Sequence, residues 1–123
     1  MKIQESAENY LETILMLHRR NGMVRSIDIV NELNYAKPSI SVAMKHFKEN
    51  DLITVDENGY ISLTKTGLDI AEKMYERHTF LTKILIQLGV DEEIAKVDAC
   101  KIEHHISDEA FEMIKHHSAK QRG

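Results

Sequence analysis

The stretch that decides the fold is SIDIVNELNYAKPSISVAMKHFKENDLITVDENGYISLT, residues 26–64. Ser26 can cap a short helix, because apolar side chains recur at helical spacing over residues 27–33. After a tight connection, Pro38 suits the first turn of another helix, where its missing N–H costs no hydrogen bond. Two β-rich runs then flank Asn58–Gly59, a strong signal for a β-hairpin. With a helix before them, these elements have the order of the winged variant of the helix-turn-helix, although three short helices and a hairpin also occur in proteins that do not bind DNA.

Helical patterns extend on both sides of this stretch. Upstream, apolar spacing predicts an amphipathic helix from Ser6 to about Arg20, ended by Gly22. Downstream we expect three more helices: residues 65–89, stopped by Gly89; residues 90–106; and a last one capped by Ser107 and running towards His117. The predicted fold class is therefore mainly α, with a winged helix-turn-helix over residues 1–64 and a helical domain over residues 65–123.

Composition and charge narrow the class of protein. Among 123 residues, 42% are apolar and 29% charged, which is typical of a globular chain. Apolar runs are too short to cross a membrane, the first residues lack a signal core, and a lone cysteine suits a reducing compartment. We therefore expect a cytoplasmic protein without membrane contact. The formal net charge of −4 disfavours general affinity for nucleic acid, but Lys37, Lys45 and Lys48 make one helix locally basic.

A second informative stretch is DACKIEHHISDE, residues 98–109. Helix positions i, i+3 and i+4 share one face, so Cys100, Glu103 and His104 point the same way while His105 turns away. A thiolate, a carboxylate and an imidazole together suit a divalent transition metal of borderline softness. The alternative is a buried cysteine beside two solvated polar side chains, and the spacing alone leaves both interpretations open.

Polar residues on two other helices bear on that choice. His78 lies among apolar positions of the long helix, and Glu12 lies one turn from Asn9 on the first helix. Taken singly, His78 would be a hydrogen-bonded core residue and Glu12 a solvated carboxylate. Because buried, unpaired polar groups are costly, inward-facing polar residues on three helices call for a common partner. One metal ion satisfies all of them.

The segments SAENYLETILML, DIVNEL, KPSISV, DLITVDENGYISLTKTG, ERHTFL and DACKIEHHISDE together resemble the diphtheria-toxin-repressor family of bacterial regulators, in which the manganese transport regulator is a close branch. The similarity covers essentially the whole chain, and its most specific part is the CxxEH pattern that follows RH. The resemblance implies a winged helix-turn-helix followed by an α-helical metal-binding and dimerisation domain. Bound metal would fix the dimer in a shape that binds DNA.

Position by position, the resemblance implies six metal ligands: Cys100, Glu103, His104, His78, Glu12 and Asn9. Cys100 is the residue type of the iron-responsive branch, whereas Glu12 is that of the manganese branch. Asn9 stands where aspartate or methionine is expected, so its oxygen would bring no charge. Thr82 and Lys96 occupy positions of a second, ancillary site, which we expect to be absent in its iron-branch form. We also expect no additional C-terminal domain of the kind that larger iron repressors carry.

The resemblance also places the third helix in the major groove of DNA. The implied DNA-binding residues are Arg25, Lys37, Pro38, Ser39, Ser41, Val42 and Lys45. The three basic side chains would contact phosphates, whereas Pro38, Ser39 and Val42 would contact base edges. The alternative for each is an ordinary solvated helix face.

The sequence thus predicts a homodimeric, metal-dependent repressor of metal-uptake genes that binds double-stranded operator DNA. Fe(II) is the first choice of metal because Cys100 adds a soft donor, Mn(II) is the alternative, and Co(II), Ni(II) or Zn(II) would substitute in vitro. Apolar residues of the last two helices exceed the needs of a small core, which predicts a dimer: Ile94, Val97, Ile102, Ile106, Phe111 and Ile114. The rivals are a metal-independent winged-helix regulator, a metal buffer, and an enzyme. We do not expect an enzyme, because no H-E-x-x-H run supplies a metallohydrolase site.

Overall fold

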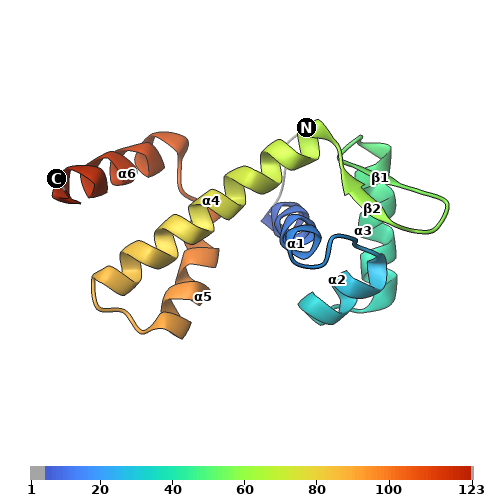
Figure 1. Ribbon diagram of the computed structural model, residues 1–123, viewed down its shortest axis with the longest axis horizontal. Helices are drawn as coiled ribbons and strands as arrows, with labels where there is room; N and C mark the ends of the chain where they lie inside the picture. The colour runs from blue at the N-terminus through green and yellow to red at the C-terminus, as the bar shows by residue number, and fades with distance from the viewer. Residues whose placement is uncertain (1–4, 123) are drawn as a thin grey trace. The chain divides into compact units, whose positions relative to one another are not determined.

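Six α-helices and one two-stranded sheet make up the described part of the chain (Figure 1). The computed structural model describes the backbone of residues 5–122 and the side chains of residues 6–119. In order, the elements are α1 (Glu5–Asn21), α2 (Ser26–Leu33), α3 (Lys37–Glu49), β1 (Ile53–Val55), β2 (Ile61–Leu63), α4 (Lys65–Gln87), α5 (Glu92–Glu103) and α6 (Asp108–Arg122). They divide into two compact units, Met1–Lys73 and Met74–Gly123, and α4 contributes to both.

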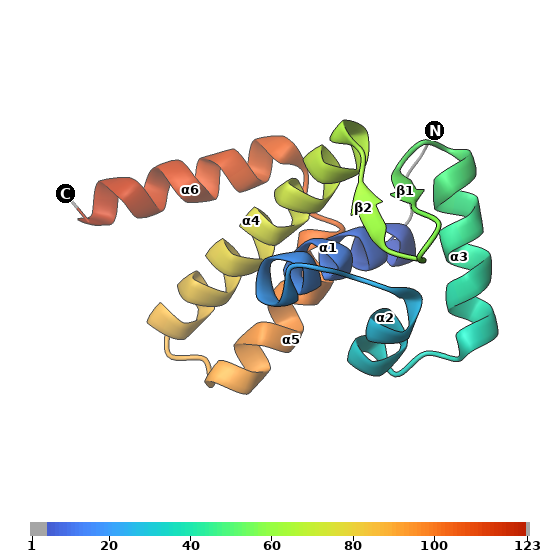
Figure 2. The same cartoon turned by 45° about the vertical axis from the view of Figure 1, so that its right-hand side comes forward.

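The first unit is a winged helix-turn-helix, as predicted. α2 packs against α1 and α3, and the hairpin packs against the same two helices (Figure 2). Every element contributes to its core, which includes Leu11, Ile14, Ile29, Ile40, Phe47, Ile53 and Ile61. Pro38 lies in the first turn of α3, and the predicted inward set of that helix, Ile40, Met44 and Phe47, is buried. The opposite face of α3 therefore points to solvent.

The start of α2 differs from the prediction. Ser26 is the first helical residue, and Arg25 occupies the N-cap position. The backbone N–H of Arg25 donates to the Asp28 carboxylate at 2.8 Å, which is one half of a capping box. The acidic side chain inside the helix, rather than the serine hydroxyl, thus satisfies the backbone at this end.

The hairpin forms where it was predicted, with Ile53 opposite Leu63 and Val55 opposite Ile61 in antiparallel register. Its loop is organised by Asp56, whose carboxylate accepts from the backbone N–H groups of Asn58 and Tyr60, each at 2.9 Å. Gly59 takes the left-handed conformation that the turn requires, with φ of 84°. The backbone N–H of Ile61 also donates to the Val24 carbonyl at 2.7 Å. The wing is therefore tied to the segment that enters α2.

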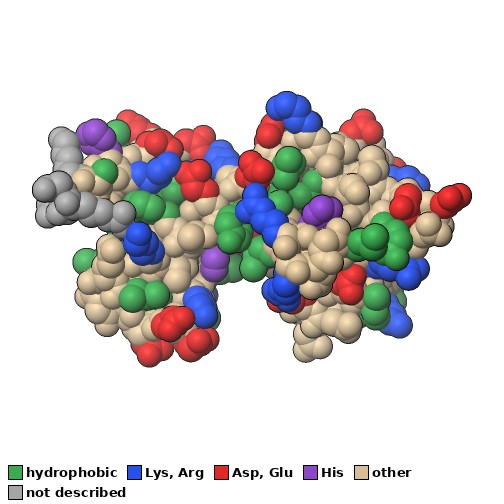
Figure 3. All heavy atoms as spheres, in the orientation of Figure 1, with side chains coloured by type: hydrophobic (Ala, Val, Ile, Leu, Met, Phe, Trp, Pro, Cys, Tyr) green, Lys and Arg blue, Asp and Glu red, His purple; other side chains and the backbone are tan. Residues whose placement is uncertain are grey.

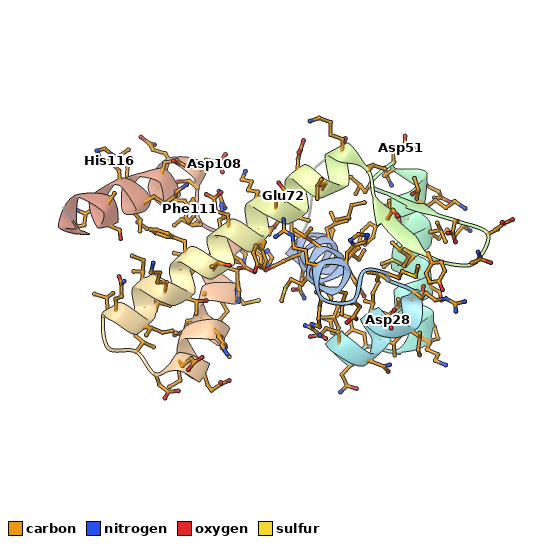
Figure 4. The ribbon with its side chains drawn as sticks, in the orientation of Figure 1. Asp28, Asp51, Glu72, Asp108, Phe111 and His116 are labelled. Carbon is orange, nitrogen blue, oxygen red and sulfur yellow. The ribbon has the colours of Figure 1, made fainter. Side chains whose placement is uncertain are left out.

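The second unit consists of the remainder of α4 with α5 and α6. Its core is built from Leu81, Ala99 and Phe111, with Phe80, Leu85 and Ile106 packed against them. Figure 4 shows Phe111 projecting from α6 towards α4, where its ring meets that of Phe80 edge to face. Phe111 is thus part of the core, whereas Ile94, Val97 and Ile102 are exposed. Fewer apolar residues than predicted are left outside the core of this unit, but these three remain on its surface.

The helix ends of the second unit follow the sequence with one exception. α4 stops as predicted, with Gly89 at φ of 106°. The Ser107 hydroxyl accepts from the Ala110 backbone N–H at 3.0 Å, so the predicted cap of α6 is confirmed. The exception is α5, predicted over residues 90–106, which begins at Glu92 and ends at Glu103. His104 and Ile106 therefore lie in the turn that joins α5 to α6.

Acidic and basic side chains are interspersed on the face that Figure 3 shows. Within the described residues, no helix has the length and apolar character that crossing a membrane requires.

Candidate metal centre and nucleic-acid interface

The end of α5 brings three predicted ligands together. Donor atoms of Cys100, Glu103 and His104 all lie within 4.8 Å of one another. Cys100 and Glu103 are one turn apart on the helix, which places them on one face. His104 has left the helix but keeps right-handed helical angles, φ −87° and ψ −12°, so its side chain continues that face. His105 is exposed, as predicted.

A fourth predicted ligand of the same unit reaches this cluster from α4. The Nδ1 atom of His78 lies 3.0 Å from one carboxylate oxygen of Glu103, and the Nε2 atom of His104 lies 3.3 Å from the other. The carboxylate of Glu103 thus stands between two imidazoles. Together the four side chains offer one sulfur, two nitrogens and two oxygens.

The surroundings of Glu103 test whether these donors fit a metal ion. Its side chain is 0% exposed, yet neither carboxylate oxygen accepts a hydrogen bond from any described residue. The Nδ1 atom of His78 is also buried, and its 3.0 Å contact with the carboxylate lacks hydrogen-bond alignment. Buried polar atoms left in this way are costly, and a cation among them removes the cost. Thiolate, imidazole and carboxylate donors fit a divalent transition metal.

The other two predicted ligands belong to α1, in the first unit. Glu12 is buried, with 5% of its surface exposed, although a lone carboxylate on α1 would ordinarily be solvated. Asn9 is half-buried, and its backbone carbonyl accepts from the Thr13 hydroxyl at 2.8 Å. Whether either residue joins the centre stays a prediction.

The two positions associated with an ancillary site differ from each other. The Thr82 hydroxyl is buried without a hydrogen bond from the described residues. Lys96 is exposed and lies 3.5 Å from Glu92 and 3.7 Å from Glu93 on its own helix. Such exposed pairs within one helix contribute little stability, and a lysine ammonium has no lone pair for a metal.

Sequence reasoning missed Arg77, which precedes His78 on α4. One guanidinium nitrogen donates to the Glu103 carbonyl at 3.1 Å and to the Ile106 carbonyl at 2.8 Å, and another pairs with the Asp108 carboxylate. The residue is only 5% exposed. Its position between Met74 and Leu81, on the buried side of the long helix, was the signal that could have drawn attention, because arginine is rarely buried without partners.

α6 is fastened to α4 by contacts beside this network. The Lys115 ammonium donates to the Glu76 carboxylate at 2.6 Å, and that hydrogen bond raises the pKa of Lys115. Arg77 and Lys115 also lie over the Phe111 ring, at 5.4 Å and 5.5 Å from its centroid. The α5–α6 turn and the start of α6 are therefore both held by α4.

The predicted DNA-binding residues of α3 share its solvent-exposed face. All six are exposed, Val42 to 69%: Lys37, Pro38, Ser39, Ser41, Val42 and Lys45. Arg25 lies outside α3, with its guanidinium 5.5 Å from the centroid of the Tyr60 ring, next to Gly59 of the wing. The exposed face of α3 thus carries Lys37 in its first turn and Lys45 further along, and Arg25 lies beside the wing.

The fold and the donor cluster define the class of protein: a winged helix-turn-helix domain followed by a helical domain that carries side chains of the metal-ligand type. Two family models match the chain. The description "Iron dependent repressor, N-terminal DNA binding domain" covers residues 2–65, and "Iron dependent repressor, metal binding and dimerisation domain" covers residues 64–120. The chain belongs to this family of metal-dependent transcription regulators, so the resemblance seen in the sequence is confirmed.

Individual relatives agree with this assignment. The transcriptional regulator MntR of Escherichia coli O6:H1 is 31% identical over 112 residues, 91% of this chain and 72% of that protein. An uncharacterised HTH-type transcriptional regulator of Methanocaldococcus jannaschii is 30% identical over 115 residues, 92% of each chain. Among solved structures, the manganese regulator SloR superposes with a TM-score of 0.81 at 24% identity, over 97% of this chain. The chain spans about half, 55%, of the length of SloR.

Proposed function

We propose that the protein is a homodimeric repressor of metal-uptake genes that binds operator DNA when its metal centre is loaded. The observation that carries the proposal is the buried carboxylate of Glu103, which lies within 3.0 Å of His78 and 3.3 Å of His104 while accepting no hydrogen bond from the described residues. Buried polar atoms without hydrogen bonds are costly, and a bound cation would offset that cost. A regulator of transcription, rather than an enzyme, accounts for the exposed face of α3 beside a wing.

We propose Fe(II) as the physiological metal. The donor atoms within the second unit are those of Cys100, Glu103, His104 and His78. A thiolate favours Fe(II) over Mn(II), because manganese gains least from sulfur, and the family is described as iron-dependent. Mn(II) is the second candidate, supported by the carboxylates of the proposed ligand set and by the relative SloR, described as a manganese regulator.

The proposed ligand set extends to α1. Glu12 supplies a further carboxylate to the same ion, and Asn9 an amide oxygen, as the family resemblance implies. The metal supplies the positive charge that holds these oxygens together with the nitrogens and sulfur of the second unit. Loading would thereby fix the DNA-binding part, residues 1–64, relative to the metal-binding and dimerisation part, residues 65–123, and set the spacing of two recognition helices in a dimer.

The proposed DNA contacts divide by chemistry. Lys37, Lys45 and Arg25 neutralise phosphates, whereas Pro38, Ser39, Ser41 and Val42 face base edges. A second copy of the chain would cover the exposed Ile94, Val97 and Ile102 of α5. Exposed isoleucine and valine side chains that recur along one helix are typical of surfaces that bind another protein chain.

The test is an electrophoretic mobility shift with the full chain and DNA selected from a random-sequence library in the presence of Fe(II). We expect a sharp loss of binding when a chelator removes the metal, and a weaker complex for Lys45→Ala, with the slope of log affinity against log salt reduced by about one. Lys83→Ala is the control, since it removes the same charge from an exposed position of α4.

Three outcomes would contradict the proposal. Equal DNA binding with and without chelator would indicate a metal-independent winged-helix regulator. Metal binding without affinity for any DNA would indicate a metal buffer. If calorimetric titration under reducing conditions shows that neither Fe(II) nor Mn(II) binds, the protein has no centre for these metals.

A further inference from the structure

Arg77 contacts one proposed ligand, Glu103, and it does so through the backbone carbonyl of that residue and not through its side chain. Its polar contacts lie at the turn that joins α5 to α6. Its guanidinium binds the carbonyls of Glu103 and Ile106 and the carboxylate of Asp108, the first residue of α6. The last carbonyls of a helix lack partners within the helix. Arg77 therefore supplies hydrogen bonds that the end of α5 needs, and it joins that end to the start of α6.

We infer that Arg77 is a positioning residue of the metal centre: it holds the α5–α6 turn so that Glu103 and His104 keep their place opposite His78. The inference rests on the proposed function. Glu103 and His104 are the last residue of α5 and the residue after it, so their side chains move with this turn. His78 follows Arg77 directly on α4. The same rigid helix therefore carries both the arginine that holds the turn and the histidine ligand that faces Glu103.

The chemistry of the guanidinium suits this task better than that of an ammonium. Its planar fork donates to three acceptors at fixed angles, whereas a lysine at the same position is a single flexible point charge. A buried cation is costly unless it is paired and hydrogen-bonded. The two terminal nitrogens of Arg77 are paired in this way, with Asp108, which remains 70% exposed, and with the two carbonyls, whereas its Nε is buried without a hydrogen bond from the described residues. The Phe111 ring, 5.4 Å from the guanidinium carbon, covers one face.

Loss of the clamp should act on the metal centre in a specific way. Cys100 lies one turn before the end of α5, and Ala99 beside it is buried in the core, so the thiolate should stay in place. Glu103 and His104 follow the released turn. We therefore expect Arg77→Met to weaken Co(II) binding by about 10- to 100-fold, the usual cost of removing a residue that orients metal ligands. The saturated variant should keep its thiolate-to-cobalt band but show shifted d–d bands.

The experiment uses the full chain, Co(II) as the probe, and four proteins: wild type, Arg77→Met, Arg77→Lys and Lys115→Met. Co(II) affinity is measured by calorimetry, the saturated protein by visible absorption, and the metal-free protein by urea unfolding. Lys115→Met is the matched control, because Lys115 also joins α6 to α4, through Glu76 at 2.6 Å, but its hydrogen bond and ion pairs go to Glu76 and Glu112 and not to the turn between α5 and α6. It should lower stability without changing Co(II) affinity or the d–d bands, and Arg77→Lys should lie between wild type and Arg77→Met.

The outcomes separate this inference from the proposed function. If wild type binds neither Co(II) nor Fe(II) nor Mn(II), the proposed function fails. If wild type binds and Arg77→Met binds within twofold, Arg77 does not position the ligands. Weaker binding with an unchanged d–d spectrum, matched by Lys115→Met, would show a general structural role and overturn the inference as well. Should Arg77→Met not fold, Arg77→Lys decides, since retained wild-type affinity and spectrum in that variant would contradict the need for a fork.

Discussion

Cys100 is the residue on which the choice of metal depends. Its sulfur lies within 4.8 Å of the donor atoms of Glu103 and His104, at a half-buried position of α5. We predict that Cys100→Ser weakens Fe(II) and Co(II) binding by about 100-fold or more, above the cost of losing an orienting residue. Mn(II) affinity should change far less, because manganese gains little from sulfur. Competitive titration with a metal-sensitive dye measures all three affinities.

His105→Ala is the control for this prediction, since His105 is adjacent in sequence to a ligand but exposed. It should leave all three affinities within about twofold, as expected of a surface substitution. Wild-type protein saturated with Co(II) should show an intense near-ultraviolet thiolate band that Cys100→Ser lacks. A wild-type spectrum without that band would exclude Cys100 as a ligand, and the preference for iron would lose its basis.

Glu103 illustrates the conflict between stability and function at a single residue. A buried polar group without a partner costs about 1–3 kcal/mol, and this carboxylate is fully buried without a hydrogen bond from the described residues. Glu103→Gln keeps the size but removes the charge, so the metal-free protein should become more stable by about 1 kcal/mol at pH 8. Urea unfolding measures this change directly.

Added metal should reverse the order of the two proteins. At a Co(II) concentration of 100 times Kd, wild type should gain about 2.7 kcal/mol of stability by mass action, whereas Glu103→Gln should gain little. Ser118→Ala, a change at another buried polar residue of the same unit, should not alter the gain. A metal-free Glu103→Gln protein that is much less stable than wild type would show that the carboxylate serves the fold itself.

At the scale of elements, the start of α4 depends on a close approach of two backbones. A Cβ atom at Gly67 would lie 2.0 Å from the Leu52 carbonyl oxygen, inside any allowed contact. Alanine normally stabilises a helix by about 1 kcal/mol relative to glycine, but here the clash should dominate. We predict that Gly67→Ala destabilises the protein by about 1–3 kcal/mol, the usual cost of overpacking.

The comparison for Gly67→Ala is Asp69→Ala, measured by the same thermal unfolding. Asp69 is exposed on the same helix and, among the described residues, pairs with Lys65 alone, at 3.2 Å, so its loss should change stability by less than about 0.5 kcal/mol. Equal stability of Gly67→Ala and wild type would mean that α4 can shift away from the Leu52 backbone without penalty.

The elements also show what the sequence could and could not predict. Local signals located the helices and the hairpin: apolar periodicity for α3, Asn58–Gly59 for the wing, and Gly89 for the end of α4. The end of α5 was predicted three residues late, because the pattern of residues 102–106 continues to look helical. The guanidinium of Arg77, 26 positions from Glu103, binds the carbonyl there, and local patterns carry no information about such a contact.

The candidate site follows the same rule. Spacing alone grouped Cys100, Glu103 and His104, because one helical turn separates them, and the structure brings their donor atoms together. His78 was added because a polar residue on an apolar face needs a partner, and it lies against Glu103 as expected. Arg77 was missed because its role depends on which carbonyls a folded turn exposes to it. The DNA face of α3 was predicted as exposed and is exposed, but contact with bases is still a prediction.

At the scale of the whole molecule, the proposed function requires that the two units communicate. The recognition helix lies in the first unit and four of the proposed ligands lie in the second, so the metal can affect DNA binding only if it also engages the first unit. Glu12 is the residue that the family resemblance assigns to that link. A buried carboxylate on α1, outside the proposed DNA-contact residues, gives the coupling a residue to test.

We predict that Glu12→Ala weakens Fe(II)-dependent DNA binding, although α3 and the wing are unchanged. By linkage, DNA must then tighten metal binding by the same factor as metal tightens DNA binding, and a factor of about 5–150 is usual for such coupling. Both factors should fall towards one in Glu12→Ala but not in Glu72→Ala, the loss of an exposed carboxylate of the first unit (labelled in Figure 4). Calorimetric titration of Fe(II) with and without the selected DNA measures one side, and mobility shifts measure the other. Equal metal affinity in the presence and absence of DNA, in wild type, would mean that the centre and the DNA-binding face do not communicate, whatever metal the ligands hold.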